Sequence, residues 1–228
     1  MSKQVQDAFI VAAKRTPIGK APKGAFRNVR PDDLLVHAIR GALAQVPGLD
    51  PAAIEDAIVG CAMPEAEQGL NVARVAALLA GLPDTVGGVT VNRFCASGLT
   101  AVAMAADRIR VGEADVMIAA GTESMSMVPM MGNKPSMNPH VFDRDENLGI
   151  AFGMGLTAEK VAQQWKVSRE AQDAFALASH QKAIAAQMIG EFADEIVPID
   201  VVERFPNLVT GAVDARTNTL LLQDTADK

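Results

Sequence analysis

The sequence has few cysteines and no long apolar segment at its N-terminus, and both absences limit where the protein is expected to work. Its two cysteines, Cys61 and Cys95, fit neither a metal-ligand spacing nor a disulfide-rich scaffold, which indicates a reducing compartment. The N-terminal residues 1–17, MSKQVQDAFIVAAKRTP, carry Asp7 and predict neither a secretory signal nor a transit peptide. We therefore expect a cytoplasmic protein.

An excess of basic residues is also missing, as are internal repeats and low-complexity tracts. The chain has 21 Lys and Arg against 27 Asp and Glu, a net charge of −6, which argues against a general nucleic-acid binder. With 49% hydrophobic residues among 228, it has enough apolar surface for a globular core in one or two domains. The uncharged run from Phe94 to Ala106 is too short to cross a bilayer and predicts a helix buried in a core, so we expect no membrane span.

Short apolar runs alternate with amphipathic segments in the first 121 residues. The expected strands lie at residues 8–12, 57–61, 89–91 and 116–120, and the expected helices at 31–46, 72–79 and 94–106. Pro31 favours a helix start and Asn71 a helix cap, whereas Gly81 favours a helix end. This alternation predicts an α/β fold in which helices cover both faces of a parallel sheet.

After Thr122 the pattern becomes rich in methionine and proline, which predicts an irregular but ordered segment. Such methionines either fill an irregular core or contact an acyl chain, and the sequence leaves both interpretations open. Two helices are expected at residues 157–165 and 168–188, the second capped by Ser168, and a strand at residues 195–202.

Cys95 lies where the strand at 89–91 turns into the next helix. A thiolate attacks efficiently, but a free cysteine with a pKa near 8.5 is mostly protonated at neutral pH. A helix start offers unpaired N–H groups and a positive dipole end, and both favour the anion. The small residues nearby would let the helix approach another backbone closely: Ala96, Ser97, Gly98 and Ala101. This position is compatible with a reactive nucleophile and with a buried structural cysteine.

The residues around Cys95 resemble a known family. Residues 92–99, NRFCASGL, are similar to the N-R-x-C-A-S-G-L signature of the thiolases, the acetyl-CoA acyltransferases. Further matches follow in order at residues 112–115, GEAD, at 120–126, AGTESMS, and at 154–159, MGLTAE. The likeness runs from Ala8 to about Val201, and ordered motifs are more specific than one short pattern.

This resemblance implies the architecture of a thiolase N-terminal half. Residues 1–121 would form an α/β domain with a mixed, mostly parallel sheet, and residues 122–228 a truncated loop domain that covers the active site and receives coenzyme A. The C-terminal thiolase half would be absent. Because the family places the last strand of the first half after the loop domain, the sheet would keep an open edge.

The resemblance also implies a reaction. Cys95 would attack the ketone carbon of a 3-ketoacyl-CoA, acetyl-CoA would leave, and coenzyme A would collect the acyl group from the cysteine. Coenzyme A is a substrate here, and neither a cofactor nor a metal is expected. The segment at residues 172–192 looks more like the branch that degrades fatty acids, although cleavage and condensation share this chemistry.

The family takes its histidine base and its second cysteine from the half that is absent. We expect His37, His140 and His180 to have packing or surface roles, and Cys61 to be a core residue. The chain ends at Lys228, so we predict no turnover by this polypeptide alone and expect a fragment or one part of a split protein.

Gly153 and Met154 are the expected substrate-binding residues. Short-chain thiolases commonly have a histidine where this chain has Gly153, and the missing ring would leave room for a longer acyl chain lined by Met154. The family pairs through the region around the nucleophile, which implies a homodimer or tetramer. Two alternatives remain open: a condensing ketoacyl synthase, and a non-catalytic module for acyl-CoA binding or dimerisation.

Overall fold

A computed structural model describes residues 5–220 of the chain. The chain forms two compact units, one of residues 134–191 and one of the residues before and after them. The described residues leave out the outer ends of the two expected domains, at residues 1–4 and 221–228. The expected domain division between residues 121 and 122 stays a prediction.

The first unit is built on a parallel sheet of three strands in the order β2-β1-β3. These strands are β1 (Asp56–Gly60), β2 (Gly87–Val91) and β3 (Met117–Gly121). Gly60 is in register with Val91 on one side and with Gly121 on the other, so all three strands end at the same edge. The strands expected at residues 57–61, 89–91 and 116–120 are confirmed to within two residues.

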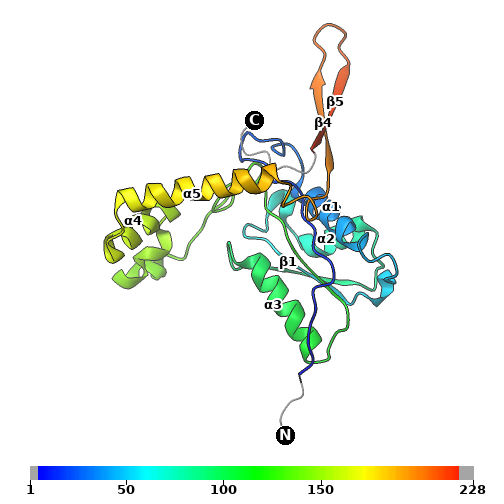
Figure 1. Ribbon diagram of the computed structural model, residues 1–228, viewed down its shortest axis with the longest axis horizontal. Coiled ribbons are helices and arrows are strands. Elements are labelled where there is room, and N and C mark those ends of the chain that lie inside the picture. Colours follow the sequence, from blue (N-terminus) through cyan, green and yellow to red (C-terminus); the bar gives the residue numbers. More distant parts are fainter. Residues whose placement is uncertain (1–4, 221–228) are drawn as a thin grey trace. The chain divides into compact units, whose positions relative to one another are not determined.

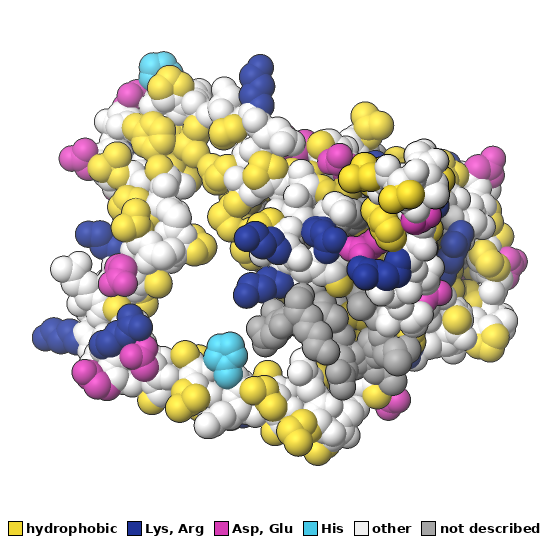
Figure 2. Space-filling model, turned by 90° about the horizontal axis from the view of Figure 1, so that it is seen from above, with side chains coloured by type: hydrophobic (Ala, Val, Ile, Leu, Met, Phe, Trp, Pro, Cys, Tyr) yellow, Lys and Arg dark blue, Asp and Glu magenta, His cyan; other side chains and the backbone are white. Residues whose placement is uncertain are grey.

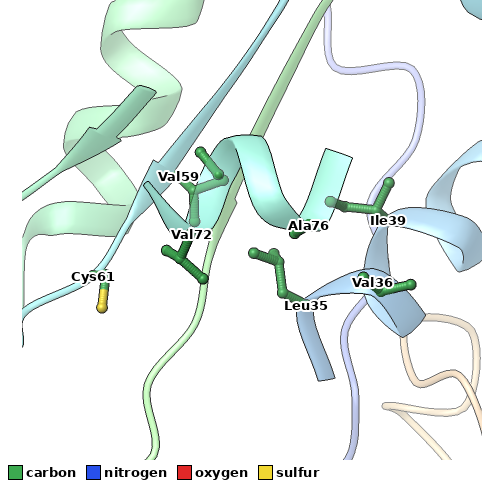
Figure 3. Packing of buried hydrophobic residues seen from close by; sticks show 8 residues of the cluster. Leu35, Val36, Ile39, Val59, Cys61, Val72 and Ala76 are labelled. Carbon is green, nitrogen blue, oxygen red and sulfur yellow. The ribbon is translucent and has the colours of Figure 1, made fainter. Parts of the chain in front are cut away.

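Helices cover both faces of this sheet, with α1 (Pro31–Leu43) and α2 (Val72–Ala80) on one side of β1 and α3 (Ser97–Arg110) on the other (Figure 1). On the first face, Leu35 and Ile39 of α1 and Val72 of α2 pack with Val59 of β1 (Figure 3). On the second face, Ala101 and Ala105 of α3 pack against Ile58 of β1. The predicted α/β fold class is confirmed.

Local signals set the helix ends largely as expected. Pro31 occupies the first turn of α1, and the side chain of Asn71 accepts a hydrogen bond from the Arg74 N–H at the start of α2. Gly81 ends α2 in the left-handed conformation, with φ +89°. Two short 3-10 turns, η1 (Pro51–Ala53) and η2 (Ala66–Gln68), connect these elements.

α3 and β2 are less buried than the sequence predicted. α3 buries one stripe, Ser97, Ala101 and Ala105, while Leu99 is 75% exposed. A helix that packs on one face of a sheet hides one stripe of side chains, spaced three or four residues apart, and leaves the others at the surface. β2 is half buried, because among the described strands it pairs with β1 alone.

The strand expected at residues 8–12 is wrong. These residues pair with no strand within residues 5–220, and Phe9, Ile10 and Val11 are more than three-quarters exposed. Together with residues of α1, α3 and β3, they line a groove of about 530 Å³. An apolar run becomes a strand only when a neighbour accepts its backbone hydrogen bonds. The groove leaves this edge of β3 open in the described part of the chain.

An antiparallel hairpin follows the second unit in sequence and belongs to the first. It pairs β4 (Ile199–Pro206) with β5 (Val213–Leu220) and stands out in Figure 1. The strand expected at residues 195–202 was predicted to begin four residues before β4 does. β5 was not expected, because its sequence is polar and it forms a strand only through backbone pairing with β4. At the base of the hairpin, Ile199 and Val201 pack against Phe26.

The second unit holds the long helices α4 (Met154–Trp165) and α5 (Arg169–Met188), preceded by the 3-10 turns η3 (Pro139–Asp143) and η4 (Asp145–Ala151). Both helices were expected, although α4 begins three residues early, and Ser168 caps α5 by accepting from the Ala171 N–H. Neither helix contains a buried residue. Hydrophobic side chains accordingly reach the surface at many places in Figure 2. Among residues 5–220, no helix combines the length and apolar character that a bilayer crossing requires.

Candidate active site

The N-terminus of α3 lies against the edge where the three strands end. A Cβ atom added to Gly60 would lie 2.4 Å from the carbonyl carbon of Ser97 and 2.5 Å from the amide nitrogen of Gly98. A Cβ atom at Gly121 would lie 3.8 Å from the Cα atom of Gly98. The close backbone approach expected from the small residues of α3 is therefore confirmed. Gly60, which makes the approach possible, was not expected from the sequence.

Cys95 is exposed and lies two residues before the first residue of α3. Three hydrogen bonds that involve side chains hold its turn: the Phe94 N–H donates to Asn92 Oδ1 (2.9 Å), the Arg93 N–H to Ser97 Oγ (2.8 Å), and the Ser97 hydroxyl to the Phe94 carbonyl (2.6 Å). Phe94 adopts a left-handed conformation with φ +47°, which is unfavourable for a bulky residue. Ser97 is 3% exposed, so the side chain that makes two of these hydrogen bonds is buried.

Two backbone amides at the start of α3 remain open. Within residues 5–220, no group accepts a hydrogen bond from the N–H of Gly98 or Leu99. The N–H groups of a helix's first turn point toward its N-terminal end and carry the partial positive charge of the helix dipole. In α3 this is the end that Cys95 precedes. Their arrangement is suited to an anion.

Cys61, unlike Cys95, lies in the core. It is 1% exposed and belongs to the core cluster drawn in Figure 3. Burial, with a smaller contribution from the negative charge of Glu123, raises the pKa of the Cys61 thiol to about 11. The thiol is therefore neutral at physiological pH, and the expected core role of Cys61 is confirmed.

Polar groups that follow the three strands meet at this edge. After β1 the Ala62 N–H donates to Glu123 Oε2 (2.7 Å), which follows β3. The Asn92 side chain, which follows β2, donates to the Ala62 carbonyl (2.9 Å). Sequence reasoning missed these contacts because the partners are 61 and 30 residues apart along the chain. The carboxyl ends of parallel strands were the available signal, since ligands collect there.

The three histidines are engaged elsewhere or exposed. His37 Nε2 lies 2.8 Å from the Pro198 carbonyl oxygen, and His140 Nδ1 lies 2.9 Å from Asp143 Oδ2. His180 is exposed on α5. In the described part of the chain, no histidine forms a hydrogen bond with Cys95, and no cluster of three metal-ligating side chains occurs.

Gly153 and Met154 belong to the second unit, whereas Cys95 belongs to the first. Gly153 immediately precedes α4, and a Cβ atom added to it would meet no other atom within 4 Å. Met154 opens α4 and is 65% exposed. The backbone at position 153 is therefore unobstructed within its own unit, and the expected room for an acyl chain stays a prediction.

Comparisons with known proteins agree with the fold. The chain is 50% identical over 197 residues to a 3-ketoacyl-CoA thiolase of Bacillus subtilis (strain 168), which covers 86% of this chain and 50% of that protein. A 3-ketoacyl-CoA thiolase of Colwellia psychrerythraea is 44% identical over 85% of this chain and 49% of its own length. The crystal structure of the Bacillus anthracis acetyl-CoA acetyltransferase superposes with a TM-score of 0.74 and 35% identity, over 95% of this chain and 55% of that one.

The chain spans about half the length of these relatives. The family described as "Thiolase, N-terminal domain" matches residues 8–221, a range that contains β1 to β5 as well as Cys95. Since this match extends over most of the sequence and the fold agrees with it, the chain belongs to the thiolase family.

Proposed function

We propose that Cys95 is the nucleophile of a thiolase that cleaves 3-ketoacyl-CoA. The observation that carries this proposal is the exposed Cys95 thiol at the N-terminal end of α3, where the N–H groups of Gly98 and Leu99 have no acceptor among the described residues. The other cysteine, Cys61, is buried and neutral, so it does not compete for this role. The names of the relatives, 3-ketoacyl-CoA thiolase and acetyl-CoA acetyltransferase, support the same chemistry.

In the proposed reaction, the Cys95 sulfur bonds to the ketone carbon of the substrate and the C=O electron pair moves to oxygen. The open amides of Gly98 and Leu99 are donors suited to that developing charge. Collapse of the adduct breaks the bond between C2 and C3, and the departing acetyl-CoA carbanion takes up a proton. The acyl-cysteine thioester then reacts with the thiolate of coenzyme A, which releases acyl-CoA and regenerates Cys95.

We propose further that the 228-residue polypeptide does not turn over by itself. Each cycle needs a base to deprotonate a thiol and an acid to protonate the leaving carbanion. No histidine among the described residues forms a hydrogen bond with Cys95, and Cys61 is neutral. The cysteine therefore has no proton-transfer partner within residues 5–220.

Fusion to the second half of the Bacillus subtilis 3-ketoacyl-CoA thiolase tests this function. We expect the fusion protein to release acetyl-CoA from 3-ketoacyl-CoA and coenzyme A, and the 228-residue chain to release none. Cys95→Ser in the fusion protein should lower kcat at least about 1,000-fold, because a neutral hydroxyl is a far weaker nucleophile than a thiolate. Cys61→Ala serves as the matched control, and full activity of Cys95→Ser would refute the assignment.

We propose that Gly153 and Met154 line the acyl-chain site and admit chains longer than acetoacetyl. The open space at position 153 supports this proposal. Gly153→His in the fusion protein should lower kcat/KM for a C8 substrate at least about 10-fold more than for a C4 substrate, since a few buried methylenes would be displaced. Gly155→Ala, also in open space, is the control. Equal loss on both substrates would contradict the assignment.

We also propose that two copies of the chain pair through the region around Cys95. Phe94 and Leu99 beside it are 61% and 75% exposed, and β2 presents a strand edge that is open among the described residues. Sedimentation velocity should therefore show a dimer at micromolar concentration, and Leu99→Glu should shift it toward monomer. Leu78→Glu, on the exposed side of α2, is the control. A monomeric wild-type chain would argue against this pairing.

A further inference from the structure

A chain of hydrogen bonds connects a buried amide to the turn that carries Cys95. Gln68 is fully buried, its Nε2 donates to the Met63 carbonyl (2.9 Å) and to Glu123 Oε1, and its Oε1 accepts from the Ser124 N–H (3.0 Å). The other carboxylate oxygen of Glu123 accepts from the Ala62 N–H. Gln68 therefore fixes the orientation of the Glu123 carboxylate.

The chain continues from Glu123 to the residue before Cys95. The Ala62 peptide binds Glu123 through its N–H and Asn92 through its carbonyl. Asn92 Oδ1 then accepts from the Phe94 N–H, 2.9 Å away, in the left-handed residue that precedes Cys95. Since that conformation is unfavourable for phenylalanine, the turn depends on contacts that hold it.

We propose that Glu123 and Gln68 are positioning residues that hold Cys95 beside the open amides of α3, acting through Ala62 and Asn92. This inference rests on the proposed role of Cys95 as nucleophile. Neither residue is proposed to contact the reacting atoms. Their function is to keep the Phe94 conformation, and hence the direction of the Cys95 side chain, from relaxing.

The chemistry of the contacts requires a carboxylate at position 123. Both of its oxygens accept from N–H groups, whereas a glutamine would place an NH₂ group against one of these donors. Glu123→Gln therefore breaks one contact with almost no change in volume. The substitution also removes a negative charge. Considered alone, this loss of charge would favour a thiolate at this edge of the sheet. Loss of positioning and loss of charge thus change the reactivity of Cys95 in opposite directions.

The test measures the rate of Cys95 alkylation by iodoacetamide in the 228-residue chain, resolved by peptide mass mapping. For the wild type we expect Cys95 to react at least about tenfold faster at pH 7 than in the urea-unfolded chain, because folding places the exposed thiol at the N-terminal end of α3, where two N–H groups are open. Glu123→Gln and Asn92→Ala should each lower the folded-state rate about tenfold, the value of one hydrogen bond of about 1.4 kcal/mol. The double variant should be no slower than the slower single variant, since both substitutions interrupt one chain.

Two further measurements separate positioning from a general loss of structure. Glu65→Gln is the matched control: its carboxylate accepts from the Asn133 side chain (2.8 Å) outside this chain of contacts, so its rate should stay at the wild-type value. The midpoint of thermal unfolding, followed by circular dichroism, reports whether each variant is folded.

The outcomes are distinguishable. A wild-type Cys95 that reacts no faster folded than unfolded would overturn the nucleophile assignment and this inference together. A reactive wild-type Cys95 whose rate is unchanged or increased by Glu123→Gln would overturn the positioning role alone. Rate losses that multiply in the double variant would show that Glu123 and Asn92 act independently, which also overturns it. If Glu123→Gln proved unfolded, Glu123→Asp would replace it, because it keeps the charge while its shorter side chain withdraws from the Ala62 N–H and from Gln68, and an unchanged rate would overturn the positioning role.

Discussion

Iodoacetamide at pH 7 is expected to alkylate Cys95 at least about 100-fold faster than Cys61 in the folded chain. Burial raises the pKa of the Cys61 thiol from 9.0 to about 11, and two pKa units correspond to an about 100-fold lower thiolate fraction than in an unperturbed thiol at this pH. Cys61 is also 1% exposed, so the reagent reaches it only when the core opens. Cys95 is exposed, so the reagent reaches it without any opening of the core.

The same reaction in guanidinium chloride supplies the control for this selectivity. Unfolding removes the burial of Cys61, so the two cysteines should then react at rates within about threefold of each other. Two cysteines that react equally slowly in the folded chain would favour a structural role for Cys95. Raising the pH from 7 to 10 should accelerate Cys61 about 1,000-fold in the folded chain, as expected below a pKa of about 11.

Gly60→Ala is expected to destabilise the first unit by at least about 3 kcal/mol, because the new methyl group meets backbone atoms that no rotamer change can move. Its Cβ atom would lie 2.4 Å from the carbonyl carbon of Ser97, so α3 must shift away from the sheet. At roughly 2–4 °C per kcal/mol for a chain of this size, the midpoint of thermal unfolding should fall by about 6–12 °C. The shift should also abolish the excess reactivity of Cys95.

Gly48→Ala is the matched control for this substitution. It makes the same chemical change where an added Cβ atom meets nothing within 4 Å, so its effect on the unfolding free energy should stay within about 0.5 kcal/mol. Scanning calorimetry or thermal circular dichroism measures both. A Gly60→Ala chain as stable as Gly48→Ala would contradict the close approach of α3 to β1.

Local sequence patterns predicted most elements of the fold. Pro31, Asn71, Gly81 and Ser168 mark helix ends in the structure as their conformational preferences suggest. The strand, turn and helix around Cys95 were predicted from the β-branched run and the small residues that follow it, and the structure places them within four residues of the expected positions. These features depend on neighbours in the chain, so a short window of sequence contains the information.

Patterns that depend on distant partners were less informative. The apolar run at residues 8–12 predicted a strand, yet it has no strand partner among the described residues. The polar β5 predicted none, yet it pairs with β4 along its whole length. In both cases hydrogen bonding to another segment settled the outcome, and neither propensity nor periodicity reports that partner.

The order of residues thus established the family, the α/β alternation and the cysteine at a helix start, because these rest on motifs and on spacing along the chain. Folding in three dimensions made one thiol exposed and the other neutral and buried, through packing that brings residues from separate elements together. It likewise aligned Gly60, Val91 and Gly121 at one edge, so that Glu123, Ala62 and Asn92 touch there. That alignment follows from the register of parallel strands, which is a relation between backbones and leaves no local trace in the sequence.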